Sequence, residues 1–399
     1  MTNQTEKKYR IRNWKEYNKA LINRGSISIW FSDDVIEKWN AKQSIKRGRP
    51  KIYSDEAILC MLMIKSVYKL PLRALRGFMI SIINMLGLCL KTPCYTRISR
   101  RASELGQEIK QLGNKKVTDI VFDSSGLKVY GEGEWKVKKH GKSKRRTWRK
   151  IHIAMCPNNH ELVVSYLGEN NEADCEVIPK IAKHLPKSIK RGYGDGAYDT
   201  DGCHAIFHSM GIESIVPPKR GAILHESGSK PWMKSRNDAI RAIIGLGNDD
   251  DARKLWKILA GYHKRSLVET GFYQWKTIFG DKLQSRKLTN QKGEVYAKSM
   301  AFNKITSLGM PKGEWIMNQK NQIQDHTDLK FDLRDNALTT KNFDIFYLYA
   351  LYNYVKYHFC FFDPIYVYKW FHVLPVYYLF LIFLRSAKGF ITLILRYFQ

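Results

Sequence analysis

The order of expected secondary structure between residues 117 and 216 constrains the fold most. Four segments with strand-like alternation or strand-forming residues come first, at 117–123, 126–130, 148–155 and 161–167. Helix-like and strand-like segments then alternate, at 174–184, 191–198, 201–210 and 212–216. The first strand ends in Asp-Ser-Ser-Gly, which predicts a turn, and Asn158-Asn159 predicts another. A strand meander followed by alternating helices and strands predicts an α/β domain, with a mixed sheet and flanking helices, over 113–317.

Residues 1–112 are expected to form a mainly helical, basic region. Ser54 is a suitable N-cap for a helix with acids in its first turn, and residues 46–51 form a basic linker. The segments that begin at Leu70 and Pro93 predict a short second helix and a basic third helix, as in a helix-turn-helix unit. Such a unit binds DNA, but a basic helical subdomain with a purely structural purpose fits the same pattern.

The net charge makes a polyanion the natural partner. Lys and Arg outnumber Asp and Glu by 67 to 37, which gives +30 at pH 7. Self-repulsion of this size destabilises a compact chain unless an anionic partner compensates it, and nucleic acid is the commonest such partner. A membrane surface competes as an explanation, but the basic residues do not form one cluster beside an apolar span. With a polar N-terminus and no paired cysteine motif, we expect a cytoplasmic protein without stable membrane association.

One expected helix carries an acid among groups that can contact phosphate. At about 100° per residue, two neighbouring stripes form between residues 262 and 279. The polar stripe contains Tyr262, Arg265, Glu269 and Lys276, and the apolar stripe contains Val268, Phe272, Trp275 and Phe279. The acid suits a metal-binding glutamate in an enzyme that acts on a nucleic-acid backbone. An amphipathic helix with ordinary ion pairs explains the spacing equally well.

Two aspartates upstream belong to expected strands. Asp123 ends the first strand and Asp195 lies in the segment 191–198. In-line displacement at phosphorus uses two divalent ions about 3.5–4 Å apart, and a few carboxylates suffice to hold them. Asp123, Asp195 and Glu269 are therefore the candidate ligands for Mg²⁺, for which Mn²⁺ can substitute. Turn capping is the alternative role of both aspartates, and Asp199 is a rival of Asp195.

These motifs resemble the DDE transposases of bacterial insertion sequences. The spacing Tyr-(2)-Arg-(3)-Glu-(6)-Lys is similar to the signature around their catalytic glutamate, and Asp195 matches the first aspartate of their Asp-Gly-Ala-Tyr-Asp pattern. The resemblance runs from about residue 14 to 310. It looks closest to the insertion sequence five family, particularly the 903-type group, and includes Trp148-Arg-Lys-Ile-His152 and Ile215-Val-Pro-Pro-Lys-Arg-Gly221.

The resemblance implies a ribonuclease H-like core in which Asp123, Asp195 and Glu269 are the catalytic acids. It implies that Tyr262, Arg265 and Lys276 form the signature that grips phosphate. It further implies binding to the element's terminal inverted repeats and to target DNA, cleavage and strand transfer, and a homo-oligomeric synaptic complex at the bacterial nucleoid. Two alternatives stay open: a catalytically decayed DNA-binding protein, and a ribonuclease H-like nuclease without strand transfer.

Further candidates for contact with DNA are basic residues and one tryptophan. Those in the helical region are Arg47, Arg49, Arg97, Arg100 and Arg101. Those of an expected basic hairpin are Lys138, Lys139, Arg145, Arg146, Trp148, Arg149 and Lys150. Trp148 suits either stacking on a base or a place in the core, and the hairpin also fits a solvated connection between strands.

Two segments depart from the α/β pattern. Residues 219–260 are polar and contain glycines, and we expect a mobile insertion between Asp195 and Glu269, with Asp249-Asp250-Asp251 as the solvated start of a helix. Residues 318–399 are rich in aromatic residues, whereas the resemblance implies a chain that ends near Trp315. We expect this tail to be a read-through or frameshifted extension. Its most apolar run, 374–384, is about half the ~20 residues that span a bilayer.

Overall fold

The computed structural model describes residues 7–42, 48, 50–113, 116–129, 148–225 and 230–317. The tail at 318–399 lies outside the described residues. Among the described residues, none of the helices combines the length and apolarity required to cross a membrane.

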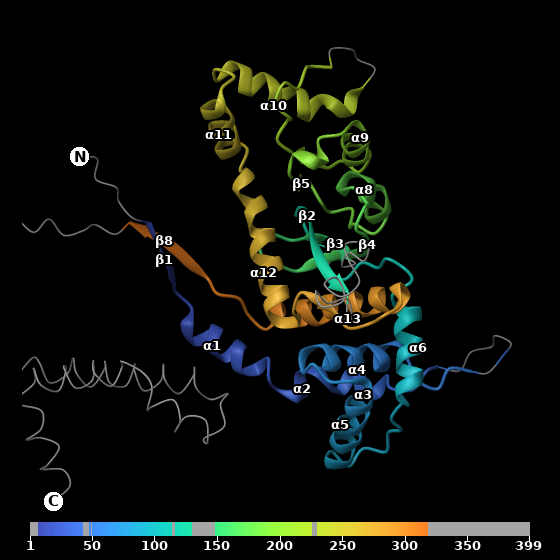
Figure 1. The fold of residues 1–399 in the computed structure, drawn as a ribbon. Helices are drawn as coiled ribbons and strands as arrows, with labels where there is room; N and C mark the ends of the chain where they lie inside the picture. Colours follow the sequence, from blue (N-terminus) through green and yellow to red (C-terminus); the bar gives the residue numbers. More distant parts are fainter. Residues whose placement is uncertain are drawn as a thin grey trace, which may run out of the picture. The chain divides into compact units, whose positions relative to one another are not determined.

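A six-stranded mixed sheet forms the centre of the fold (Figure 1). Its strands are β2 (Asp119–Val129), β3 (Trp148–Met155), β4 (Leu162–Glu169), β5 (Arg191–Tyr193), β6 (Glu213–Ile215) and β7 (Lys282–Leu283). The order is β4-β3-β2-β5-β6, and β7 pairs with the far end of β2. β2, β3 and β4 are antiparallel, whereas β5 and β6 continue parallel to β2. This is the strand order of a ribonuclease H-like fold, as the sequence predicts.

The predicted turn at Asp-Ser-Ser-Gly is wrong. β2 runs through these residues without a break, and its pairing with β3 continues from Val121↔Met155 to Lys128↔Trp148. Serine and glycine disfavour strands only weakly, so pairing with a neighbouring strand overrides them. The predicted strand at 191–198 is shorter than expected, because β5 ends at Tyr193 and a 3₁₀ turn, η1 (Gly196–Tyr198), follows.

Helices cover both faces of the sheet, and β2 contributes alternate residues to two cores. Ile120 and Phe122 pack with α8 (Asp174–Ala182) and α9 (Asp201–Ser209) on one face. Val121 points to the opposite core, which includes residues of α12 (Leu267–Phe279) and α13 (Leu288–Ser307). The alternation follows from the two-residue period of a strand.

The N-terminal helices share the second of these cores. They are α2 (Ile27–Trp30), α3 (Asp33–Glu37), α4 (Asp55–Val67), α5 (Leu72–Met85) and α6 (Tyr95–Leu105). The first helix, α1 (Trp14–Asn23), contributes no residue to that core. The Ser54 hydroxyl accepts a hydrogen bond from Ala57 N at 3.0 Å, which confirms the predicted N-cap of α4. The second helix, α5, has 14 residues and is not short.

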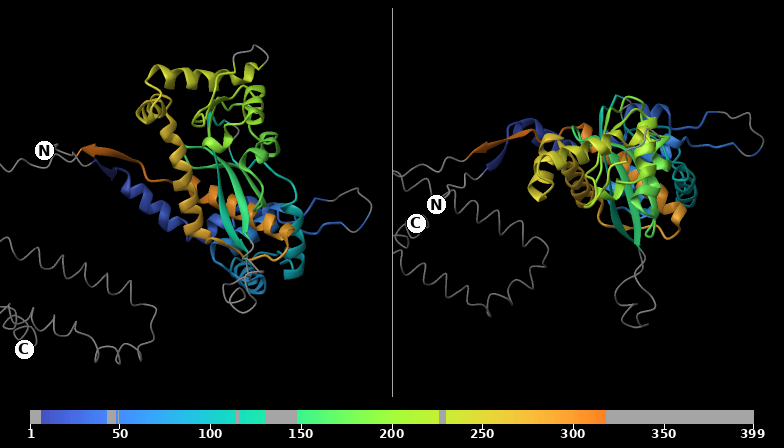
Figure 2. Two further views of the ribbon diagram at one scale, coloured as in Figure 1. Left: turned by 45° about the horizontal axis from the view of Figure 1, so that its top comes forward. Right: turned by 90° about the horizontal axis from the view of Figure 1, so that it is seen from above.

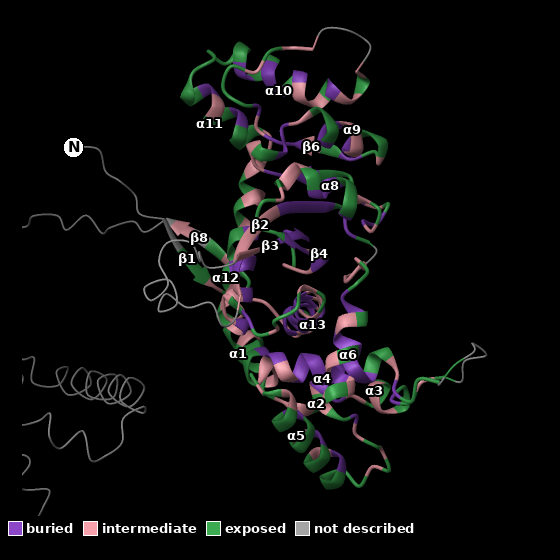
Figure 3. Ribbon diagram, turned by 45° about the vertical axis from the view of Figure 1, so that its right-hand side comes forward, coloured by how far each residue is buried: buried purple, intermediate pink, exposed green. Residues whose placement is uncertain are grey.

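Helix α13 lies between the sheet and α4 (Figure 3). The end of α6 contacts its first half, at Gly293. An added Cβ at Gly293 of α13 would overlap Ala102 O of α6, and one at Gly106 would overlap Gly293 N. The two backbones are therefore in direct contact. Met1–Gln319 form one compact unit of the fold. The predicted division at residue 112, between a DNA-binding region and a catalytic domain, stays a prediction.

The two ends of the described chain also meet. β1 (Lys7–Ile11) pairs antiparallel with β8 (Gly313–Met317), so the first and last described strands lie side by side (Figure 2). Arg12 and Glu314 add an ion pair to this ribbon.

The insertion at 219–260 is largely helical. It contains η2 (Pro231–Met233), α10 (Lys234–Gly245) and α11 (Asp250–Leu259), and Ala239, Ile243, Ala252 and Trp256 form a small core. Sequence analysis missed this core because its apolar residues are few and widely spaced. The Asp249 carboxylate accepts from Ala252 N at 2.6 Å, so the acidic triplet starts a helix, as predicted.

Candidate active site

Asp123 lies within β2, at the centre of the sheet. Its side chain is 16% exposed, and its carboxylate accepts a hydrogen bond from Ser124 N at 2.9 Å. Burial raises the pKa of Asp123, and the nearby charges of Asp195 and Asp174 raise it further, while Ser124 N–H and Arg265 oppose them. Burial is the largest of these causes, so the raised pKa reflects mainly the loss of solvent around the Asp123 carboxylate.

Asp195 follows β5, which runs parallel to β2, and it caps the turn η1. Its carboxylate accepts from Ala197 N at 2.9 Å, and its side chain is 41% exposed. An added Cβ at Gly194 would lie 2.7 Å from the Tyr198 ring. The close packing of this ring on Gly194 fixes the path of the backbone into Asp195.

Asp199, the rival of Asp195, belongs to a buried network. Its carboxylate accepts from His204 Nε2 at 3.1 Å, Arg236 Nε at 2.9 Å and Lys219 N at 3.0 Å. Burial raises the pKa of Asp199, but these hydrogen bonds outweigh it and lower the pKa to about 2. Its side chain is 1% exposed, so it ties α9 to the insertion and is not accessible to substrate.

Glu269 lies on α12, in a segment that differs from the prediction of one continuous helix. Tyr262–Ser266 form a 3₁₀ helix, η3, after Gly261, whose φ of 64° ends the preceding helix. The predicted apolar face is confirmed, because Val268, Phe272, Trp275 and Phe279 are all buried. Glu269 is 61% exposed on the other side.

Arg265 brings the predicted acids together. Its Nη2 lies 3.3 Å from Asp123 Oδ2 and 4.0 Å from Asp195 Oδ2, and its Nη1 is ion-paired with Glu269 Oε1. Residues from β2, from the loop after β5 and from α12 therefore converge on one guanidinium. Figure 1 shows α12 alongside β2 and β5. Lys276 adds a second link, since its Nζ donates to Ser125 Oγ of β2 at 2.6 Å.

A family model described as a transposase DDE domain matches residues 115–304, and another with the same description matches residues 22–132. The chain belongs to the DDE transposases. A solved structure titled "Drosophila P element transposase strand transfer complex" is similar at 11% sequence identity and a TM-score of 0.23. The match covers 72% of this chain and 70% of the chain in that complex.

The donor set of this transposase fits a hard divalent ion. All the donors of Asp123, Asp195 and Glu269 are carboxylate oxygens, which Mg²⁺ and Mn²⁺ favour. Among the described residues, no cluster of His, Cys, Asp or Glu is arranged to hold a metal ion as it stands. The guanidinium of Arg265 occupies the position between the acids.

Sequence analysis missed a fourth acid of the transposase, Asp174, at the start of α8. Its carboxylate lies 2.9 Å from Lys150 Nζ and 3.2 Å from His152 Nδ1, and it contributes to the raised pKa of Asp123. Burial raises the pKa of Asp174, but the nearby polar groups of His152, Lys150 and Ser124 outweigh it and hold the pKa well below its usual range. The signal was the motif 148–152, which places Lys150 and His152 two residues apart on one side of β3.

The structure changes the set of candidate DNA contacts. Arg101 is 6% exposed, donates to Tyr53 O at 3.0 Å and pairs with Asp55, so these contacts favour a structural role, and its predicted contact with DNA stays a prediction. Arg100 is exposed and Arg97 lies 5.6 Å from the Tyr53 ring. The remaining basic candidates at 47, 49, 138, 139, 145 and 146 lie outside the described residues.

Three residues at the start of β3 have partners within the transposase. Arg149 donates to Gln291 at 3.2 Å, and Lys150 pairs with Asp174. Trp148 is half-buried over Gly126, where an added Cβ would lie 3.1 Å from its ring. Their predicted contacts with DNA stay predictions.

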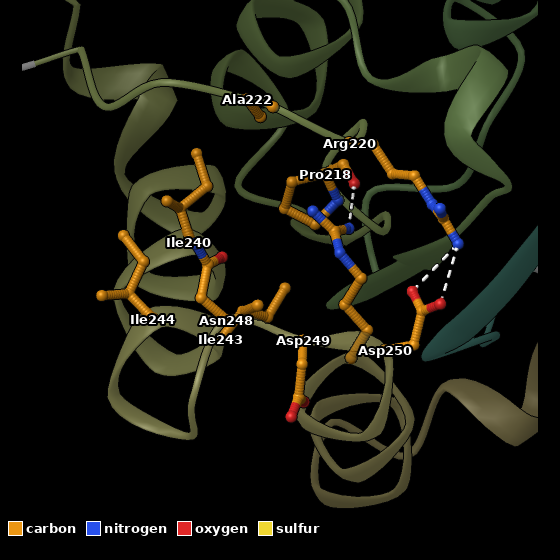
Figure 4. Close-up of a pocket in the computed structure, with 11 residues that line it drawn as sticks. Pro218, Arg220, Ala222, Ile240, Ile243, Ile244, Asn248, Asp249 and Asp250 are labelled. Carbon is orange, nitrogen blue, oxygen red and sulfur yellow. Dashed lines mark hydrogen bonds and ion pairs between the residues drawn. The ribbon is translucent and has the colours of Figure 1, made fainter.

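The insertion contains a separate cavity of about 470 Å³ (Figure 4). Its lining includes Pro218, Ile240, Asn248 and an ion pair between Arg220 and Asp250 at 2.9 Å. None of the three predicted acids lines it, so it is distinct from the candidate active site.

Proposed function

We propose that this transposase binds the terminal inverted repeats of its element and catalyses metal-dependent DNA cleavage and strand transfer with Asp123, Asp195 and Glu269. One observation carries the proposal: these acids come from distant segments and meet around the single guanidinium of Arg265. An accidental ion pair on a helix surface, the alternative for Glu269, requires only Arg265 and gives no reason for the two aspartates to join it.

The fold supports different tasks for the three acids. Asp123 lies on the central strand, which gives it the least freedom to move. Asp195 and Glu269 are more exposed and approach from a capped turn and a docked helix. When bound, Mg²⁺ would activate the attacking hydroxyl and stabilise the leaving oxygen. The carboxylates would hold the ion, and the link from Lys276 to Ser125 keeps α12 against β2.

The basic groups of the signature would bind the DNA backbone. Arg265, Lys276 and Tyr262 lie at the same site, and burial raises the pKa of Tyr262 to about 12, so its hydroxyl stays protonated and able to donate. We further infer that Mg²⁺ is the preferred ion and that the transposase belongs to the 903-type group. Binding of two element ends in one synaptic complex favours a homo-oligomer.

A cleavage assay on the full chain tests this function. The substrate is a duplex ending in the inverted repeat, with Mg²⁺ or Mn²⁺. Replacing Asp123 or Asp195 with Asn, or Glu269 with Gln, should lower the cleavage rate on the order of 10³-fold or more, because metal stabilisation of the transition state is worth several kcal/mol. DNA binding in a gel-shift assay should persist.

The exposed Asp251 provides a matched control, since its carboxylate pairs with Lys254 on α11. Asp251→Asn should cleave at the wild-type rate. Band shifts without cleavage by the wild-type chain would leave only a DNA-binding protein, and cleavage without joined product would indicate a nuclease.

A further inference from the structure

Arg265 is unusual among the cations near the candidate site. Within the part of the chain that the structure describes, it is the one side chain ion-paired with Asp123, Asp195 and Glu269 together. Its neighbours have other partners: Lys264 pairs with Asp119 at 2.6 Å, and Lys276 donates to Ser125. The side chain of Arg265 is 19% exposed, so it can reach solvent or a ligand at the mouth of the site.

We propose that Arg265 is an exchangeable internal cation: it holds the three acids together before a divalent ion binds, and it leaves them when the ion and DNA bind. A DNA phosphate would accept hydrogen bonds from the guanidinium and so draw it away from the acids. The affinity of the acids for the ion would rise as a result. This inference rests on the proposed function, because it takes the three acids as the ligands of the ion.

The guanidinium and a divalent ion compete for the same space. Nη2 lies within 4.0 Å of an oxygen of both aspartates, whereas Mg²⁺ binds oxygen at about 2.0–2.1 Å. An ion that contacted both oxygens would overlap or directly repel Nη2. Binding of the ion therefore requires the guanidinium to withdraw.

The present position of Arg265 also leaves a donor unused. Among the described residues, its buried Nε has no hydrogen-bond partner, and an unsatisfied buried donor is unfavourable. A phosphate offers acceptors in the planar arrangement that the guanidinium fork prefers. The Lys264 side chain ties η3 to Asp119 of β2, so the exchange would take place by rotation of the Arg265 side chain while η3 stays in place.

Binding of Mn²⁺ to the full chain tests the exchange without any measure of catalysis. Electron paramagnetic resonance of free Mn²⁺ gives the affinity, with and without a duplex that ends at the already cleaved terminus. Without DNA, Arg265→Ala should bind Mn²⁺ at least about fivefold more tightly than wild type, within the usual range of coupling between sites. The duplex should raise the affinity of wild type and leave that of Arg265→Ala almost unchanged.

Lys276→Ala is the control for the loss of a nearby positive charge. Lys276 contacts Ser125 rather than the acids, so its loss should change Mn²⁺ affinity far less than Arg265→Ala. Equal affinities for wild type and Arg265→Ala, or equal gains in both Lys276→Ala and Arg265→Ala, would overturn the inference.

A double variant separates this inference from the proposed function. Asp123→Asn combined with Glu269→Gln should abolish tight Mn²⁺ binding. If the double variant binds Mn²⁺ as tightly as wild type, the metal site itself is misassigned. If the double variant loses Mn²⁺ binding but Arg265→Ala binds Mn²⁺ as wild type does, only the exchange is wrong. Should Arg265→Ala unfold, Arg265→Gln takes its place, and Mn²⁺ should raise its melting temperature more than that of wild type, because the ion replaces the missing cation.

Discussion

Asp195 and Asp199 lie on either side of η1, and their surroundings separate their roles. Asp195 is partly exposed and faces Arg265, whereas Asp199 is buried among His204, Arg236 and the backbone of Lys219. Four residues of chain are enough to reverse exposure, because η1 turns the backbone between them.

Replacement of Asp195 with asparagine should affect cleavage, whereas replacement of Asp199 with asparagine should affect stability. Asp195→Asn is expected to abolish cleavage with little change in the free energy of unfolding. Asp199→Asn should lower that free energy by about 3 kcal/mol, because it leaves the partly buried Arg236 without its counter-charge. Urea unfolding and the cleavage assay measure the two quantities on the same preparations. If the Asp199→Asn protein were stable but inactive, Asp199 would be the catalytic aspartate and Asp195 the structural one.

The free energy of unfolding should depend on pH through the ionisation of Asp199. The pKa of Asp199 is about 2 in the folded chain, below the ordinary value of about 3.9 for an aspartate, so folding favours the charged form. The resulting stabilisation, about 2 kcal/mol, is fully present above pH ~4 and is lost as the pH falls toward 2. Urea unfolding of wild type and Asp199→Asn at several pH values checks this, and the difference between them should shrink in acid.

At the scale of elements, α13 joins the helical region to the sheet. Several of its polar residues are buried, and Glu294 pairs with Lys298 at 2.8 Å and accepts from Gln284 N and Ser285 N. These bonds hold the loop after β7 against the helix. Its contact with α6 depends on glycine, since the backbones meet at Gly106 and Gly293.

Two mid-helix glycines should therefore respond oppositely to alanine. An added Cβ at Gly293 overlaps the backbone of α6, whereas one at Gly77 in α5 has nothing within 4 Å. Gly77→Ala should raise the free energy of unfolding by roughly 0.5–1 kcal/mol, the usual gain over glycine in a helix. Gly293→Ala should lower it by more than about 1–3 kcal/mol, the usual cost of overpacking. Thermal or urea unfolding decides, and a stable Gly293→Ala protein would contradict the close contact.

At the scale of the whole molecule, the charge of +30 governs association with DNA. Neutralisation of phosphates releases counterions, so the binding constant should fall steeply with salt. With six to ten phosphate contacts, the expected loss is about 10³–10⁵-fold between roughly 50 and 200 mM salt. Fluorescence anisotropy with duplexes that contain or lack the repeat measures the slope and the specificity.

Arg100 and Arg101 provide a matched pair for this measurement. The exposed Arg100 should contribute about one contact, so Arg100→Ala should reduce the salt slope by ~1 without loss of stability. Arg101→Ala should instead destabilise the fold, because Arg101 is buried against Tyr53 O and Asp55. A salt-independent affinity would exclude the phosphate backbone as the main partner.

The sequence by itself determined the features with a local cause. The N-cap of α4, the buried face of α12 and the strand and helix order of the α/β core follow from a few neighbouring residues. The acidic start of α11 was predictable for the same reason. Periodicity and capping are properties of short segments, so tertiary packing did not alter them.

Only the tertiary structure decided the features that depend on distant partners. Pairing with β3 carries β2 through Asp-Ser-Ser-Gly, and burial removes Arg101 from the surface. The segment around Asp174 gives no signal of its own, since its partners Lys150 and His152 belong to β3, and nothing in the segment around Arg265 indicates its central place. Arg265 and Asp123 are 142 positions apart, and sheet pairing and helix docking bring them within reach of each other.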